Sequence, residues 1–162
     1  MGPLGHTVVS AGIGVSVWAA TGSAPALPAA IATGVLVDAD HVLDFYYLYV
    51  KKDRRRIFVL LHGWEYSVVA LALVLGVWYH PALLAGVLGH LGHLAGDQAR
   101  NSPAHPLAYS IAYRAGSRFR RAGLFPEPPA TLSEALHQSI PLWDRIEPSL
   151  LRLSSGYRRA RR

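Results

Sequence analysis

The distribution of positive charge constrains the fold of this chain most. None of its 16 lysines and arginines lies in residues 1–50 or 57–99. Five of them form the run KKDRRR at 51–56, and the others begin at Arg100 and continue to the end of the sequence. Apolar segments bracketed by basic ones are typical of membrane helices with cytoplasmic loops. We therefore expect a membrane protein, and do not expect nucleic-acid binding, despite a pI near 10.0.

Four apolar segments divide the first hundred residues, at 4–21, 24–45, 57–79 and 81–99. Each approaches the roughly 20 residues that a membrane span requires. The turn sequences TGSAP and HP between them predict antiparallel hairpins, and the many small residues predict close helix contacts. We expect an all-α fold, an integral membrane bundle of about four transmembrane helices with C-terminal amphipathic helices. A soluble bundle of very hydrophobic helices is the alternative.

Composition also predicts two parts of the chain. Residues 1–101 would form a membrane helical metal-binding domain, and residues 102–162 a basic cytoplasmic or interfacial tail with helices at 103–123 and 132–153. Basic loops favour the cytoplasmic side, so both termini are expected inside a multi-pass protein of the inner membrane. No positively charged region precedes the first apolar segment, so a cleaved signal peptide is not expected.

Ionisable residues occur at selected ends of the apolar segments. They open the first and third segments and close the second and fourth, and the alternating helix directions bring all of these ends to the cytoplasmic side. Such residues are costly within a membrane and therefore indicate function. The residues are His6 in the first segment, Asp38, Asp40, His41 and Asp44 in the second, His62 and Glu65 in the third, and His90, His93 and Asp97 in the fourth.

This group of residues predicts a metal site. Five carboxylates without a nearby lysine or arginine would repel one another, and divalent cations would neutralise them. Because the chain has no cysteine, histidine and carboxylate must supply the ligands. We expect zinc, with manganese as the second choice, and more than one ion. Each motif alone arises easily by chance, so the prediction depends on their joint placement. The predicted ligands are His6, Asp38, Asp40, His41, His62, His90, His93 and Asp97.

The motifs resemble a known family. A GH pair near the N-terminus, DADH, HGWEYS and HLGHLAGD resemble motifs of the bacterial and archaeal inner-membrane metal-dependent hydrolases related to YdjM. The resemblance covers about residues 5–101, but the family motif HRGxTHS has a histidine directly before its serine, where this chain has Tyr66. The motif chemistry is also similar to helical zinc-dependent phospholipases C and nucleases. The resemblance implies a hydrolase.

The resulting functional hypothesis is metal-dependent hydrolysis of a phosphoester, including lipid phosphoesters, at the cytoplasmic membrane face. Glu65 or Asp44 would act as general base, and Arg100 and Arg114 would help to hold a phosphate. Membrane lipids and a phosphate-containing substrate are the expected partners. Two alternatives remain open: a non-enzymatic metal-binding membrane protein, such as a carrier or an assembly factor, and a basic adaptor that acts through its tail.

Overall fold

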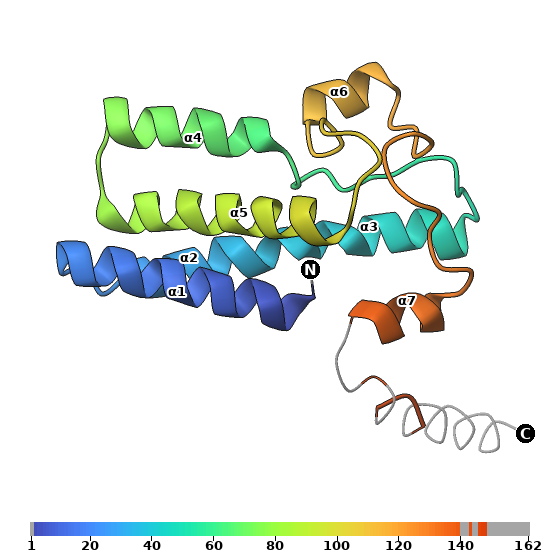
Figure 1. Cartoon of the computed structure of the whole chain (residues 1–162), viewed down its shortest axis with the longest axis horizontal. Coiled ribbons are helices and arrows are strands. Elements are labelled where there is room, and N and C mark those ends of the chain that lie inside the picture. Colours follow the sequence, from blue (N-terminus) through green and yellow to red (C-terminus); the bar gives the residue numbers. More distant parts are fainter. Residues whose placement is uncertain (1, 140–142, 144–145, 149–162) are drawn as a thin grey trace, which may run out of the picture.

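The computed structural model describes residues 2–139, 143 and 146–148 (Figure 1). Every regular element within these residues is a helix, and an isolated antiparallel bridge joins Arg56 to Arg120. The predicted all-α class is therefore confirmed. The elements are α1 (Pro3–Thr21), α2 (Ala26–Leu36), the 3₁₀ turn η1 (Val37–Asp40), α3 (His41–Phe45), the π-helical turn η2 (Tyr46–Val50), α4 (Trp64–Gly76), α5 (Pro81–Arg100), α6 (Ile111–Gly116) and α7 (Leu132–Ser139).

Short turns connect the first helices where the sequence predicts them. Gly22 ends α1 in a left-handed conformation, with φ of 72°, and its N–H donates to the Trp18 carbonyl. A glycine adopts this conformation without the steric cost that a Cβ imposes. At the start of α5, the His80 side chain accepts a hydrogen bond from the Ala82 N–H, and Pro81 occupies the first helical position. The α1–α2 and α4–α5 hairpins follow from these turns.

Small residues bring α1, α2 and α5 into close contact. A Cβ added at Gly34 of α2 would overlap the Ser10 side chain of α1, and one added at Gly89 of α5 would overlap the Ala30 backbone. Gly14 of α1 lies equally close to the backbone of α2, at Leu27. The prediction that small residues allow close helix approach is confirmed at these positions.

The helix directions bring four particular ends together. In Figure 1 the start of α1, the end of α2, the start of α4 and the end of α5 all lie at one end of the bundle, next to α3. These are the ends that carry the ionisable residues of the apolar segments. The antiparallel arrangement therefore places the candidate site at one end, while residues 18–28 and 74–84 at the opposite end contain no Asp, Glu, Lys or Arg.

The prediction of about four membrane spans is not confirmed. Within the described residues, two helices are long and apolar enough to cross a membrane: Pro3–Thr21 and the continuous run Ala26–Val50. Helix α4 has only 13 residues, about 20 Å of helix against a hydrocarbon core of about 30 Å. Its predicted first turns, residues 57–63, form irregular chain. Helix α5 has sufficient length, but its polar C-terminal half lowers its hydropathy.

The segment after Arg100 packs against the bundle. The helix predicted at 103–123 is present only as α6, and the remainder of that segment forms turns. Of the helix predicted at 132–153, α7 is observed and most of the rest lies outside the described residues, as does the basic end of the tail. Arg114 and Arg121 are both buried against residues of the first hundred. The segment after Arg100 is thus joined to the first hundred residues through two buried arginines.

Candidate metal centre

Four side-chain atoms from three parts of the chain converge at the polar end of the bundle. The Nε2 atoms of His62 and His93 lie 3.0 Å apart. Asp38 Oδ1 lies 3.4 Å from His62 Nε2 and 3.5 Å from His93 Nε2, and Asp97 Oδ2 lies 3.7 and 3.6 Å from the same two atoms. A tetrahedral zinc ion with bonds of about 2.0–2.2 Å separates its ligand atoms by about 3.3–3.6 Å. Three of the five distances lie in this range, the Asp97–His62 distance is 0.1 Å longer and the His62–His93 distance is 0.3 Å shorter, so the spacing is close to that of a tetrahedral site.

The tautomers of the two central histidines are determined by their other ring nitrogens. His93 Nδ1 lies 2.8 Å from the Gly34 carbonyl oxygen, which can only accept, so Nδ1 carries the proton. His62 Nδ1 lies 3.1 and 3.2 Å from the two carboxylate oxygens of Asp40 and donates likewise. In the neutral rings both Nε2 atoms then present lone pairs to each other at 3.0 Å. A proton or a metal ion between them must relieve this repulsion.

In the absence of metal, the carboxylates favour a proton on His62. Burial lowers the pKa of this histidine, but hydrogen bonds with Asp38 and Asp40 and the charges of Asp40 and Asp97 outweigh burial and raise the pKa to about 9. The His62 side chain is fully buried, so bulk water does not screen these interactions. His62 therefore carries a proton at neutral pH in the absence of metal.

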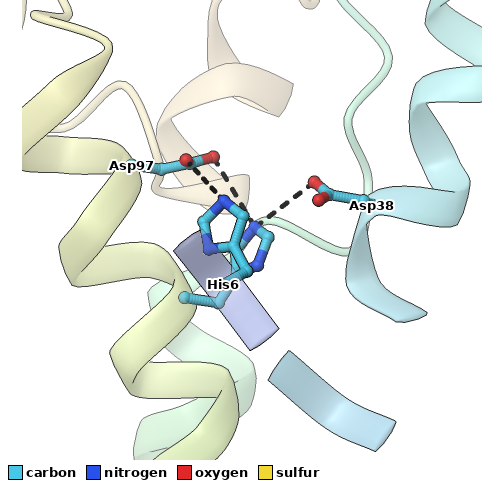
Figure 2. A group of neighbouring side chains, drawn as sticks. His6, Asp38 and Asp97 are labelled. Atoms are coloured by element: carbon cyan, nitrogen blue, oxygen red, sulfur yellow. Dashed lines mark ion pairs between the residues drawn. The ribbon is translucent and has the colours of Figure 1, made fainter. Parts of the chain in front are cut away.

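Two further histidines border this group. The His6 ring stacks on the His93 ring, with centroids 3.6 Å apart, and His6 Nε2 lies 3.0 Å from Asp97 Oδ1. His41 Nε2 lies 3.4 Å from Asp38 Oδ1 on the more exposed side. Figure 2 shows the carboxylates of Asp38 and Asp97 pointing toward imidazole nitrogens from opposite sides. Two overlapping sets have metal-compatible spacing: His6, Asp38, His93 and Asp97, and Asp38, His41 and His62.

Side chains from other elements hold the irregular segment that carries His62. Phe58 N–H donates to Asp44 Oδ1 and Leu61 N–H to Asp40 Oδ2, at 3.0 and 2.6 Å. Both ends of the irregular segment 57–63 are thus hydrogen-bonded to carboxylates of the helix Ala26–Val50. His90 Nε2 donates to the Leu61 carbonyl at 3.0 Å.

Arg114 binds this segment from the opposite direction. Its guanidinium is fully buried and donates to the carbonyls of Val59 and His62, both at 2.5 Å. Helix α6, which carries Arg114, is itself held by Glu65, whose carboxylate accepts hydrogen bonds from Ser110 Oγ and from two backbone N–H groups, those of Ile111 and Ala112. The position of His62 therefore depends on the segment after Arg100.

The structure brings most of the predicted ligands together. The gathered residues are His6, Asp38, Asp40, His41, His62, His93 and Asp97. The structure places His90 differently, because one ring nitrogen contacts Ser67 Oγ at 2.5 Å and the other the Leu61 carbonyl. Both of its nitrogens are engaged outside the cluster.

The two predicted general bases also have structural partners. Glu65 caps α6, as described above, and Asp44 pairs with Arg121 at 2.9 Å while accepting from Phe58 N–H. Of the two arginines expected to hold phosphate, Arg114 is occupied by backbone carbonyls, whereas Arg100 lines a cavity beside Asp38 and Asp97. The sequence analysis did not single out Arg121 or the Gly34 carbonyl, and no local motif marks either.

Two cavities adjoin the metal centre. One of about 500 Å³ is lined by Asp38, His41, Asp97 and Arg100. The other, of about 270 Å³, is lined by His41, His62, Arg121 and several aromatic side chains. Asp38 is the most accessible of the four converging groups, with 22% of its side chain exposed. The centre is thus buried on one side and reachable on the other.

No family model, no curated protein and no solved structure matches the chain.

Proposed function

We propose that this protein is a membrane-bound, metal-dependent hydrolase that acts on a phosphoester at the cytoplasmic face. The observation that supports this proposal is the pair of facing Nε2 atoms of His62 and His93, flanked by carboxylate oxygens of Asp38 and Asp97 at 3.4–3.7 Å. The fixed tautomers make both histidines ready to bind metal, and Asp40 and the Gly34 carbonyl serve as the outer partners that metal-bound histidines usually have.

The ligands favour zinc. Two imidazoles and two carboxylates without a thiolate suit zinc, and manganese accepts the same donors less selectively. A bound divalent ion would lower the pKa of a water molecule to about 7 and polarise a phosphoryl oxygen.

Two neighbouring histidines have separate roles in this proposal. His6 orients Asp97 through Oδ1, the carboxylate oxygen that does not face His62 and His93. His41 faces both cavities and contacts Asp38, so we assign it the role of proton acceptor in place of Glu65 and Asp44.

The proposed membrane location is supported by the outer surface of the helices. Only 22% of the apolar window of each candidate span is buried within the protein, whereas the core helix of a soluble protein is mostly buried. Large apolar residues are exposed on α1, α2 and α4, including Val8, Leu36 and Val68. Water would not tolerate so much outward apolar surface, but a bilayer would. The basic run at 51–56 favours the cytoplasmic side for the end of the helix Ala26–Val50, and the candidate metal centre at Asp38 lies about 20 Å along this helix from that run.

The experiment compares two histidines of α5. His93→Asn removes a converging ligand, and His80→Asn makes the same change at the other end of the helix, where asparagine still caps the first turn. We expect detergent-purified wild type and His80→Asn to retain zinc or manganese and to hydrolyse phosphoesters, and His93→Asn to lose both properties. Retention of stoichiometric metal by His93→Asn would contradict the proposed centre.

A non-enzymatic metal-binding protein is the second candidate. It is favoured by the number of converging protein ligands, since structural zinc sites have four and catalytic sites usually three. Fully metal-loaded protein that fails to hydrolyse both soluble and lipid phosphoesters would support this candidate over the hydrolase.

A further inference from the structure

A cavity of about 270 Å³ on the His62 side of the metal centre has an unusual combination of walls. His41 and His62 line it where it adjoins the metal centre, and Arg121 is the buried cation that lines it. Aromatic rings of Phe45, Tyr109 and Phe125 form much of the remaining wall. The cavity therefore combines apolar surface, a guanidinium and direct access to a metal-ligand histidine.

The guanidinium of Arg121 is only partly used by the protein. Its Nη2 donates to Asp44 Oδ2 at 2.9 Å, while its Nε is buried and has no hydrogen-bond partner among the described residues. Only 9% of the side chain is exposed. A buried donor without an acceptor is destabilising, and a guanidinium offers five N–H donors suited to a tetrahedral oxyanion. An anionic group in the cavity would supply the missing acceptors.

Other arginines near the site are less suitable for this role. Arg114 donates to two backbone carbonyls, and Arg54 donates to the carbonyls of Pro128 and Pro129. Arg100 lines the larger cavity, but the carboxylates of Asp38 and Asp97 line it too and would repel an anion. In the smaller cavity the Asp44 carboxylate is bound by Arg121 and by Phe58 N–H, and Glu127 is exposed.

We propose that this cavity binds the phosphoryl group of the substrate between Arg121 and the metal centre, with the ester substituent against Phe45, Tyr109 and Phe125. This inference rests on the proposed hydrolase function and specifies its substrate class. A cavity of about 270 Å³ is at the lower end of small-molecule sites. The substrate is therefore a small phosphoester with an aromatic or apolar substituent, and a two-chain lipid is too large for the cavity.

The test measures binding of inorganic phosphate to the purified full-length protein by titration calorimetry, with metal content determined on the same sample. Arg121→Gln should weaken phosphate binding about 10-fold or more, because a charged hydrogen bond contributes about 1.5–3 kcal/mol. Arg120→Gln, the same change at the exposed neighbouring arginine, should leave the affinity unchanged. Equal phosphate affinity in Arg121→Gln and wild type, or no phosphate binding by wild type, would overturn the subsite.

A second variant keeps the test valid if Arg121→Gln misfolds, since that substitution leaves the buried Asp44 carboxylate without its cationic partner. Asp44→Asn removes the competing carboxylate and retains Arg121, so phosphate should bind more tightly than to wild type. Weaker binding in Asp44→Asn that retains wild-type metal content would also overturn the subsite. If the wild-type protein holds no metal, the proposed function fails. The subsite is then still tested by comparing the phosphate affinity of the metal-free wild type with that of metal-free Arg121→Gln.

Discussion

His62 and His93 meet at their Nε2 atoms because each donates its other ring proton to a fixed acceptor, Asp40 for His62 and the Gly34 carbonyl for His93. The charge between the rings is then either a proton or a metal ion, and the two compete. At the scale of single residues, a proton and a metal ion would therefore compete for one position, the space between the two Nε2 atoms.

This competition gives a pH dependence with a definite sign. The pKa of His62 is about 9 in the folded metal-free protein against 6.5 for an unperturbed histidine. Its proton stabilises the metal-free fold fully below pH 6.5, and that contribution is lost as pH rises through 9. The affinity for metal should change in the opposite direction and rise with pH, since at pH 7 each ion must displace this proton.

We therefore expect proton release on zinc binding at pH 7, measured by calorimetry in buffers of different ionisation enthalpy. Zinc affinity should increase as pH rises toward 9, while the melting temperature of the metal-free protein falls over the same interval. Zinc binding without proton release at pH 7 would show that His62 is not the protonated ligand.

Arg114 helps to fix the position of His62. Arg114→Lys retains the charge, but one ammonium cannot reproduce the planar donors that reach the carbonyls of Val59 and His62. We expect a loss of about 2–4 kcal/mol in unfolding free energy and weaker zinc binding, measured by denaturation and by competition with a chelator. Arg118→Lys, at an exposed position, is the control and should change neither quantity.

At the scale of elements, the ends of α1, α2, α4 and α5 determine which residues can meet. Hydropathy and the basic runs were sufficient to predict that these ends converge, because the direction of each helix follows from the short turns between them. The start of α4 was not predictable in this way. His62 and Glu65 are spaced for one helix face, but α4 begins at Trp64, so His62 faces the metal centre while Glu65 caps α6.

The cause of this difference is non-local. Residues 57–63 do not continue the helix because their backbone groups bind Asp40, Asp44, His90 and Arg114, which are distant in sequence. Hydrophobic periodicity depends only on residues that are close in sequence, so it cannot predict these contacts between distant residues. For the same reason the sequence did not reveal that Asp44 and His90 hydrogen-bond the backbone of residues 57–63, and their predicted roles in catalysis and metal binding stay predictions.

The interface between α2 and α5 allows a test at the level of elements. Gly89→Ala places a Cβ against the backbone of Ala30, which cannot move independently of α2. We expect a destabilisation of about 1–3 kcal/mol, measured as a lower melting temperature in detergent. Gly12→Ala in α1 has no atom within 4 Å of the added Cβ. It should be neutral or stabilising by up to about 1 kcal/mol, and equal losses in both variants would contradict the close-packing interpretation.

At the scale of the whole molecule, the proposed orientation predicts a sidedness that can be measured directly. The helix Ala26–Val50 has 25 residues, about 37 Å in length, which is sufficient to cross a hydrocarbon core of about 30 Å. The chain has no cysteine, so single cysteines can be introduced without removing native ones. Ala24→Cys and Lys51→Cys place a thiol just beyond each end of this helix.

We expect a membrane-impermeant thiol reagent to label Ala24→Cys in intact cells and Lys51→Cys only in inverted vesicles. The Cys-free parent protein controls for non-specific labelling. Labelling of both positions from the same side would show that this helix does not cross the membrane, and would leave a peripheral or soluble bundle as the alternative.

The contact between Ser10 and Gly34 links helix packing to the orientation of a candidate metal ligand. The carbonyl that determines the tautomer of His93 belongs to Gly34, where an added Cβ would overlap the Ser10 side chain of α1. A larger residue at either position would shift that carbonyl together with the packing of α1 on α2. The ring orientation of His93 is therefore sensitive to two positions that do not touch the imidazole cluster through their own side chains.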